Sequence, residues 1–239
     1  MNFSGSEWLS TAGFKKWRHV LRKGAAAFHI ELDDFHIERF YRHAGALLQW
    51  SQKTNLTAIT DPQEVAVKHF VDSLAPISFM GPMQRVLDLG SGGGFPGLPL
   101  KIVCSDIDLT LLDAVRKKVS FVQHVIRLLE LKNTRGVHAR LENLGQDASI
   151  AAFDTVVCRA FSNLKFIITH SLPLLTETGQ IVIWKGRVPQ KEIIEVQPLL
   201  VRKEKPLSLS LLPYQLPIIN AHRTIVLVNA GGNVPVGKS

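Results

Sequence analysis

The stretch Arg85-Val-Leu-Asp-Leu-Gly-Ser-Gly-Gly-Gly-Phe-Pro-Gly97 decides the fold, because a short apolar run leads directly into a glycine-rich turn. The apolar run predicts a buried strand over 85–89, and the residues after the turn predict a helix over 95–103. Residues without side chains let the backbone approach a ligand closely, and the start of the following helix offers unpaired N–H groups. Strand, loop and helix together predict a cofactor-binding domain.

After Gly81 the sequence alternates short apolar runs with helical stretches. Besides the first strand, the pattern predicts strands over 107–113, 136–139, 154–158, 180–184 and 223–229. Helices are predicted between them over 115–131, 164–175 and 189–201. This alternation is typical of an α/β fold with a doubly wound, mostly parallel sheet. The last strand follows another strand-like run without an intervening helix, so a closing hairpin and an antiparallel final strand are expected.

The first eighty residues are predicted to be mostly helical. Apolar residues recur at helical spacing from Asp33 to about Gln52. A second helix start is indicated by Asp61-Pro62-Gln63-Glu64, with a capping acid, proline at the first helical position and Glu three residues after the cap. Residues 1–80 are therefore assigned to a helical N-terminal extension, and 81–239 to the cofactor-binding domain.

The glycine loop fits two cofactor motifs. Asp88, Gly90, Gly92 and Gly94 form Asp-x-Gly-x-Gly-x-Gly, the first motif of S-adenosylmethionine-dependent methyltransferases. Gly92, Gly94 and Gly97 form Gly-x-Gly-x-x-Gly, the dinucleotide motif of an NAD(P)-dependent oxidoreductase. Asp88 favours the first, because a carboxylate there would meet a cationic methionine moiety and repel a pyrophosphate. Asp113, at the end of the second strand, suits the ribose hydroxyls of either cofactor.

The chain of 239 residues carries 28 Lys and Arg against 20 Asp and Glu, a net charge of +8 that favours a polyanionic partner. The densest basic stretch is 116–140, where Glu130 is the single acid. Its bases are Arg116, Lys117, Lys118, Arg127, Lys132, Arg135 and Arg140. The first three stand near a predicted helix N-terminus, where positive charge opposes the macrodipole, so they are candidates for RNA binding or form a solvated helix face.

A second basic run, Phe14-Lys-Lys-Trp-Arg-His-Val-Leu-Arg-Lys23, interleaves bases with an aromatic residue. It is interpreted either as an RNA-contacting helix or as a frayed extension.

Other classes of protein are disfavoured by composition. The two cysteines lack a Cys-x-x-Cys spacing and the nine histidines lack a metal-ligand spacing, so neither a disulfide scaffold nor a metal site is expected. No signal peptide or bilayer-spanning segment is recognised, and a cytoplasmic protein is expected. The sequence does not define the oligomeric state, although a monomer is favoured.

Several motifs, taken in order, resemble the RsmG family, also called GidB. They are Asn55-Leu-Thr-Ala-Ile-Thr60, Lys68-His69-x-x-Asp72-Ser73-Leu74, the glycine loop extended to Leu100, Leu111-Leu-Asp113 with Lys117-Lys118, Arg159-Ala160-Phe161 and Lys185-Gly186. The resemblance covers roughly residues 35–228. It implies a class I, Rossmann-like fold and S-adenosylmethionine-dependent methylation of guanine N7 in the small-subunit (16S) ribosomal RNA of bacteria.

The resemblance also implies site residues. The cofactor contacts carried over are Gly90, Phe95, Asp113, Ala114, Leu141, Glu142 and Arg159, to which the glycine motif adds Asp88 and Gly92. Arg159, Lys185 and His69 are candidates for positioning the substrate, although His69 and Asp72 also fit a buried polar pair. Guanine N7 carries no proton, so no obligatory catalytic base is expected. The implied partner is 16S rRNA or a small-subunit precursor, and the alternative is a noncatalytic RNA-binding or assembly protein.

Overall fold

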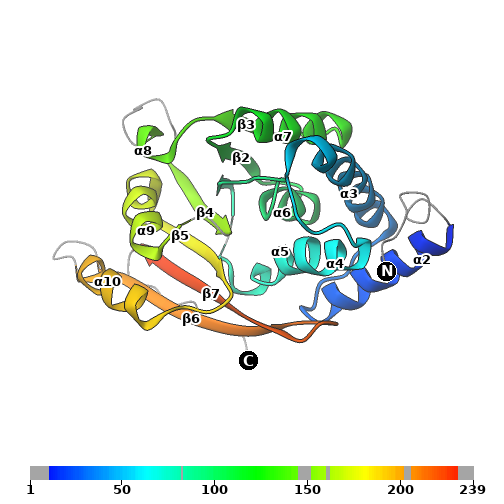
Figure 1. The fold of residues 1–239 in the computed structure, drawn as a ribbon. Helices are drawn as coiled ribbons and strands as arrows, with labels where there is room; N and C mark the ends of the chain where they lie inside the picture. Colours follow the sequence, from blue (N-terminus) through cyan, green and yellow to red (C-terminus); the bar gives the residue numbers. More distant parts are fainter. Residues whose placement is uncertain (1–10, 82, 145–151, 160–161, 202–205, 231–239) are drawn as a thin grey trace.

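The computed structural model describes residues 11–81, 83–144, 152–159, 162–201 and 206–230. They form a seven-stranded sheet with helices on both faces (Figure 1). Its strands are β1 (Arg85–Leu89), β2 (Asp108–Asp113), β3 (Thr134–His138), β4 (Phe153–Arg159), β5 (Leu175–Lys185), β6 (Leu207–Leu216) and β7 (Ala221–Ala230). The order is β3-β2-β1-β4-β5-β7-β6. Strands β1 to β5 pair in parallel, and β7 is antiparallel to β5 and β6, which confirms the predicted α/β sheet.

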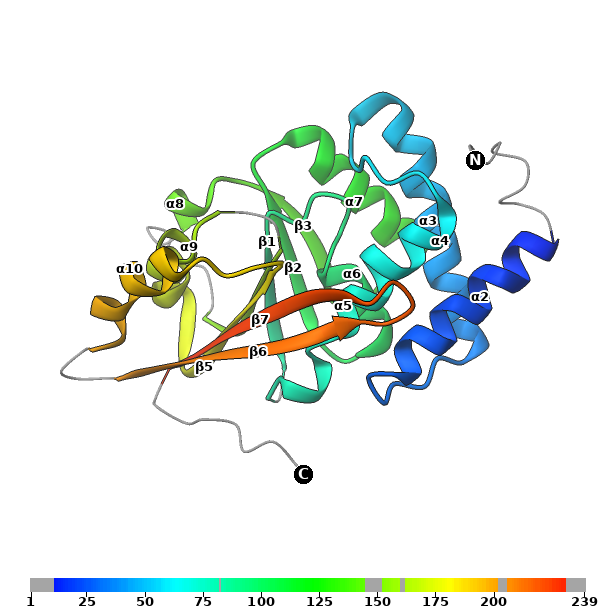
Figure 2. The same cartoon turned by 60° about the horizontal axis from the view of Figure 1, so that its bottom comes forward.

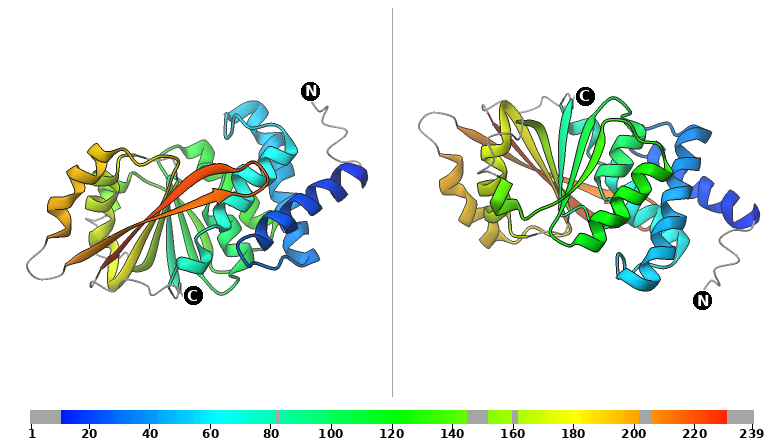
Figure 3. Two further views of the ribbon diagram at one scale, coloured as in Figure 1. Left: turned by 90° about the horizontal axis from the view of Figure 1, so that it is seen from below. Right: turned by 90° about the horizontal axis from the view of Figure 1, so that it is seen from above.

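Helices cover the two faces of the sheet in separate groups. On one face lie α6 (Gly97–Val103) and α7 (Arg116–Leu128), with the N-terminal helices outside them (Figure 3). On the other face lie α8 (Leu141–Leu144), α9 (Leu164–Ser171) and α10 (Gln190–Leu200). Because β1 to β4 are parallel, the loops that follow them meet at one edge of the sheet, where open α/β folds bind their ligands.

The N-terminal segment is helical, as predicted. It comprises α2 (Thr11–Ala26), α3 (Asp34–Thr54), α4 (Pro62–Val65), the π-helix η1 (Ala66–Val71), α5 (Asp72–Leu74) and the short 3-10 helix η2 (Ile77–Phe79). The predicted cap at Asp61 is present, since its side chain accepts a hydrogen bond from Glu64 N, and Asp33 caps α3 by accepting from His36 N. The π-helix was not predicted from the sequence. It adds one residue per turn in the segment that faces the sheet edge.

One hydrophobic core joins the N-terminal helices to the α/β part. Leu47 of α3 and Phe70 of η1 lie in the same buried cluster as Leu98 of α6 and Phe121 of α7. Trp50 and Phe121 pack edge to face, with their ring centroids 5.5 Å apart. The helical segment thus buries its apolar faces against the sheet domain, while the division at residues 80 and 81 stays a prediction.

The predicted elements differ from the structure mainly at their ends. The helix predicted over 164–175 ends at Ser171, and a 3-10 turn, η3 (Leu172–Leu174), follows because Pro173 cannot continue the helix. As a result β5 begins five residues before the predicted start at Gln180. Pro213 lies within β6, which forms the sheet edge, where a missing N–H donor is tolerated. Among the described residues, no helix is both long and apolar enough to cross a membrane.

Candidate functional site

The glycine loop after β1 is fastened to the end of β2. Gly90, Gly92 and Gly94 have φ angles of 67°, 53° and 84°, a region that side chains disfavour. Gly90 N donates to the Leu112 carbonyl oxygen over 2.8 Å, and Gly92 N donates to Asp113 Oδ2 over 3.0 Å. Asp113 Oδ1 accepts from Val115 N over 2.8 Å. The Asp113 carboxylate therefore ties together the loop, the end of β2 and the approach to α7.

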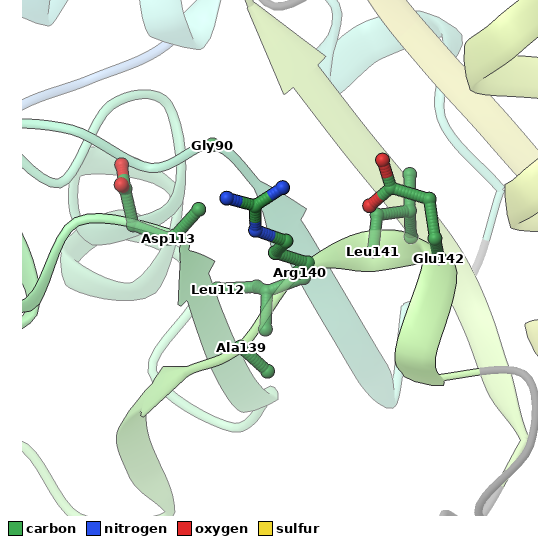
Figure 4. Close-up of a pocket in the computed structure, with 8 residues that line it drawn as sticks. Gly90, Leu112, Asp113, Ala139, Arg140, Leu141 and Glu142 are labelled. Atoms are coloured by element: carbon green, nitrogen blue, oxygen red, sulfur yellow. The ribbon is translucent and has the colours of Figure 1, made fainter.

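A hollow of about 150 Å³ lies beside this loop at the ends of β1, β2 and β3. It is lined by Gly90, Leu112, Asp113, Ala114, Ala139, Arg140, Leu141 and Glu142. Five of these residues were predicted as cofactor contacts: Gly90, Asp113, Ala114, Leu141 and Glu142. Figure 4 shows the Arg140 side chain extending over the hollow between the carboxylates of Asp113 and Glu142. Leu112, Ala139 and Arg140 were not predicted as contacts, since their place at the hollow depends on strand pairing.

The lining of the hollow fits a nucleoside. Leu112, Ala139 and Leu141 offer apolar surface for a base, and Asp113 keeps lone pairs that can accept from ribose hydroxyls. The absence of a side chain at Gly90 leaves one wall formed by backbone. The volume is below the roughly 300–1,000 Å³ of pockets that enclose a whole small ligand. The hollow therefore suits the nucleoside half of a larger cofactor.

Asp88, by contrast, faces the start of α6 and does not line the hollow. Its side chain is fully buried, and Oδ2 accepts from Gly97 N over 2.8 Å. A Cβ at residue 97 would lie 2.6 Å from this oxygen, so glycine is required there. Burial raises the pKa of Asp88 to about 7, and Oδ1 has no hydrogen-bond partner. The carboxyl group holds the glycine loop to α6, and its contact with a cofactor stays a prediction.

Replacing Asp88 with asparagine is expected to remove a pH dependence of stability. Between its unfolded pKa near 4 and its folded pKa of about 7, Asp88 holds a proton in the folded state that the unfolded state has released. As the pH rises from about 4 to about 7, the wild-type protein should therefore lose stability relative to Asp88→Asn. In that variant the carbonyl oxygen of the asparagine side chain can still accept from Gly97 N. Urea unfolding at a series of pH values measures the difference, with the exposed Asp106→Asn as control. If the free energy of unfolding changed with pH in the same way in the wild type and in Asp88→Asn, Asp88 would not have the raised pKa.

Phe95, the next predicted cofactor residue, lies between the glycine loop and the N-terminal helices. Its ring stacks on the imidazoles of His43 and His69, with centroid distances of 4.8 and 4.7 Å. His43 is fully buried, and its Nε2 lies 2.8 Å from the Gly93 carbonyl oxygen, which fixes Nε2 as the donor. Burial lowers the pKa of His43 to about 4 and, together with the charge of Arg159, that of His69 to about 3. Both imidazoles are thus neutral near pH 7.

Arg159 connects the end of β4 to the N-terminal helices. Its Nη1 donates to the Lys68 carbonyl oxygen over 3.0 Å and lies 3.3 Å from Asp72 Oδ2. Its Nη2 lies 3.2 Å from His69 Nδ1, which as part of a neutral imidazole accepts the hydrogen bond. His69 Nε2 then donates to Thr57 Oγ1 over 2.8 Å. Arg159, His69 and Asp72 are brought together, so the predicted polar pair of His69 and Asp72 is joined through this guanidinium.

Asp72 also contacts the terminal hairpin. The Tyr214 hydroxyl of β6 donates to Asp72 Oδ1 over 2.7 Å, and Arg223 Nε of β7 lies 4.0 Å from the same oxygen. Trp184 Nε1 of β5 donates to the Asp72 carbonyl oxygen over 2.8 Å. Burial, and next the charge of Asp72, raise the pKa of Tyr214, so its hydroxyl stays protonated and donates. These partners, far apart in sequence, were not predicted.

The remaining predicted residues lie apart from the hollow. Lys185 Nζ pairs with Glu192 Oε2 at 2.9 Å, and the same oxygen accepts from Leu164 N at the start of α9. The predicted role of Lys185 in positioning the substrate therefore competes with this internal ion pair. Arg116 and Lys117 are exposed and Lys118 is half-buried in the first turn of α7. Ala160 and Phe161, from the motif that contains Arg159, lie outside the described residues.

The sheet order, the glycine loop after β1 and the acid at the end of β2 define the fold of class I S-adenosylmethionine-dependent methyltransferases. A solved structure of this class, the O-methyltransferase TomG from Streptomyces achromogenes in complex with SAM, has a TM-score of 0.57. It covers 91% of this chain and 98% of its own at 15% sequence identity, a likeness of fold alone.

The family model for rRNA small subunit methyltransferase G (GidB) matches residues 36–213, and the chain belongs to this family. A curated relative named Ribosomal RNA small subunit methyltransferase G, from Geobacter sp. (strain M21), is 43% identical over 74% of this chain and 81% of its own length. Another of that name, from Geotalea uraniireducens (strain Rf4), is 39% identical over 88% and 95%. The resemblance seen in the sequence is confirmed, and the oxidoreductase reading of the glycine loop is not retained.

Proposed function

We propose that this protein transfers a methyl group from S-adenosylmethionine to N7 of a guanine in 16S ribosomal RNA. The observation that carries the proposal is the family match over 36–213 combined with a nucleoside-sized hollow at the glycine loop. The proposed partner is 16S rRNA or a precursor of the small ribosomal subunit, and the proposed place of action is the bacterial cytoplasm.

The residues around the hollow would hold the cofactor. Asp113 would accept from the ribose, Leu141 and Ala139 would contact the adenine, and Glu142 and Arg140 would border it. Gly90 and Gly92 would let the backbone approach, and Phe95 would close the site on the side of the N-terminal helices. When bound, S-adenosylmethionine supplies an electrophilic methyl group on a sulfonium sulfur.

The chain's own contribution to the reaction is positioning. Guanine N7 presents an in-plane lone pair and no proton, so no side chain has to remove one. Holding the two reacting atoms in line can lower the barrier by about 7–11 kcal/mol. Arg159 is suited to this role because Asp72, His69 and the Lys68 carbonyl fix its guanidinium at the end of β4. The methylated guanine ring is positively charged, so an arginine beside the ring would oppose the reaction. Arg159 would instead position an anionic group, either the methionine carboxylate or an RNA phosphate.

Arg116, Lys117 and Lys118 are proposed to bind RNA next to the cofactor. They follow β2 directly, so they lie at the same edge of the sheet as the hollow. α7 begins without a side-chain cap or an acid in its first turn, so these bases lie at a helix end whose positive dipole no carboxylate of that turn offsets.

The proposal predicts methyl transfer to one guanine. Full-length protein, methyl-labelled S-adenosylmethionine and 16S rRNA lacking the modification should yield N7-methylguanine at a single position, mapped by mass spectrometry. Naked RNA and small-subunit particles are tested in parallel, because either can be the substrate. Methylation at another atom would contradict the proposed specificity. Cofactor binding without any transfer, to RNA or particle, would instead favour a noncatalytic assembly protein.

A further inference from the structure

Helix α2 is fixed on the body of the protein by one of its faces. Trp17, Leu21 and Ala25 are at most 1% exposed, and Trp17 Nε1 donates to the Pro62 carbonyl oxygen over 3.0 Å. Gly24 lies so close to η1 that a Cβ there would be 2.6 Å from Val71 Cγ2. The aromatic residue of the N-terminal basic run is therefore a core residue, and the helix is not a frayed extension.

The opposite face of α2 is basic. The helix contains no acid, and Lys15, Lys16 and Lys23 are exposed, while Arg18 and Arg22 are partly exposed. Arg18 and Arg22 both pair with the exposed Asp34, at 3.4 and 2.8 Å. In the part of the chain that the structure describes, no carboxylate pairs with the three lysines. Figure 2 shows α2 at the outside of the helical layer. Because Trp17, Leu21 and Ala25 on its other face are buried, the basic face is open to solvent.

This charge distribution costs stability unless an anion is bound. Like charges three or four residues apart on one helix face repel by a few tenths of a kcal/mol per pair, as at Arg18 and Arg22. Asp34 offsets part of this repulsion for the arginines but leaves the lysines uncompensated. Lys15 and Lys23 are separated by eight residues, about 12 Å along the helix axis, so a short basic strip is held at fixed spacing. An extended polyanion is the complementary partner.

The exposed face of α2 favours RNA over a membrane. A helix that lies in a bilayer surface needs an apolar face free to enter the lipid. In α2 the apolar face is used by the protein core, and its exposed positions are Lys15, Lys16, His19, Lys23 and Ala26. Binding at such a face depends on charge alone, which is how proteins contact a phosphate backbone.

We propose that the outer face of α2 binds phosphates of the RNA substrate through Lys15, Lys16, Arg18, Arg22 and Lys23. The inference rests on the proposed function and adds a contact outside the family-matched range, which begins at residue 36. Because α2 packs on η1, whose residues contact Arg159, RNA bound there is held at a fixed position relative to the site.

The salt dependence of RNA binding tests this surface. The variant Lys15→Gln/Lys16→Gln/Lys23→Gln leaves the ion pairs of Arg18 and Arg22 with Asp34 in place. Each phosphate contact to a single strand contributes about 0.7 to the slope of log affinity against log salt, so losing three contacts should make the slope shallower by about 2. The probe is a 16S rRNA transcript, and the full-length chain is used. A charge-preserving variant, Lys15→Arg/Lys16→Arg/Lys23→Arg, should keep the wild-type slope. Affinity for S-adenosylmethionine should be unchanged in all variants.

A matched control separates local contact from net charge. Arg127→Gln/Lys132→Gln/Arg135→Gln removes the same charge between the end of α7 and β3, at the sheet edge opposite the hollow. It should change the slope by less than half as much. Equal slopes for the α2 variant and this control would overturn the inference. A second outcome would also overturn it: the α2 variant alone loses binding to phosphatidylglycerol vesicles, while the salt dependence of its RNA binding stays as in the wild type. That result would indicate a membrane partner.

Failure of the α2 inference can be distinguished from failure of the proposed function. If the wild-type protein methylates 16S rRNA but the α2 variant matches the control, only the α2 contact is wrong. If the wild-type protein methylates neither naked RNA nor particles, the proposed function fails, whereas a salt slope that falls in the α2 variant and not in the control would still show that α2 contacts the RNA.

Discussion

Replacing Asp72 with alanine should lower the free energy of unfolding by about 3–5 kcal/mol, because it leaves a buried guanidinium without its counter-ion. The Arg159 side chain is 15% exposed, and Asp72 is the carboxylate that pairs with it at 3.3 Å. The same change removes the acceptor of the Tyr214 hydroxyl, 2.7 Å away. Since these partners belong to β4 and β6, the loss would act on the contact between the N-terminal helices and the sheet.

Urea unfolding measures this loss, and two variants test its cause. Asp34→Ala removes a carboxylate that also pairs with two arginines, but at an exposed position, so its cost should stay below about 1 kcal/mol. Tyr214→Phe removes only the hydroxyl donor to Asp72 and should cost about 1.5–3 kcal/mol. If Asp72→Ala were no more destabilising than Asp34→Ala, Asp72 would not be the residue that holds Arg159.

The parts of the site that could be predicted from the sequence are local. The strand, the glycine loop and the helix after it are contiguous, so their pattern of apolar residues and glycines defines them without tertiary information. Asp113 was found for the same reason, because it ends a strand whose apolar run is visible. The pairing of Asp72 with Arg159, 87 residues apart, depends on a π-helix and on how the N-terminal segment packs. No local pattern contains either.

The basic stretch 116–140 is continuous in the sequence but not in space. The thirteen residues of α7 span about 20 Å. The helix therefore carries Arg127 away from Lys117 to the opposite edge of the sheet, together with Lys132 and Arg135 before β3. Arg140, after β3, returns to the hollow. The bases of this stretch are therefore divided among three places, and the first turn of α7 is the part proposed to bind RNA near the cofactor.

Replacing Asp113 with alanine should weaken S-adenosylmethionine binding about 10- to 100-fold. Hydrogen bonds to charged groups contribute about 1.5–3 kcal/mol each, and the proposed ribose contact would be lost. The change also frees Gly92 N and Val115 N, which the carboxylate now holds at 3.0 and 2.8 Å, so the glycine loop would be less well fixed. Asp113→Asn retains one acceptor oxygen and should lose less affinity than the alanine variant.

Titration calorimetry of the full-length variants measures the change in affinity. Asp106→Ala, an exposed acid before the other end of β2, is the matched control and should bind the cofactor like the wild type. Urea unfolding shows whether each variant keeps its fold, which separates loss of a contact from loss of structure. Wild-type affinity in a folded Asp113→Ala variant would rule out the ribose contact. The ribose hydroxyls would then have to donate to Glu142, the other acid that lines the described hollow, or the nucleoside would be held by the apolar residues Leu112, Ala139 and Leu141 alone.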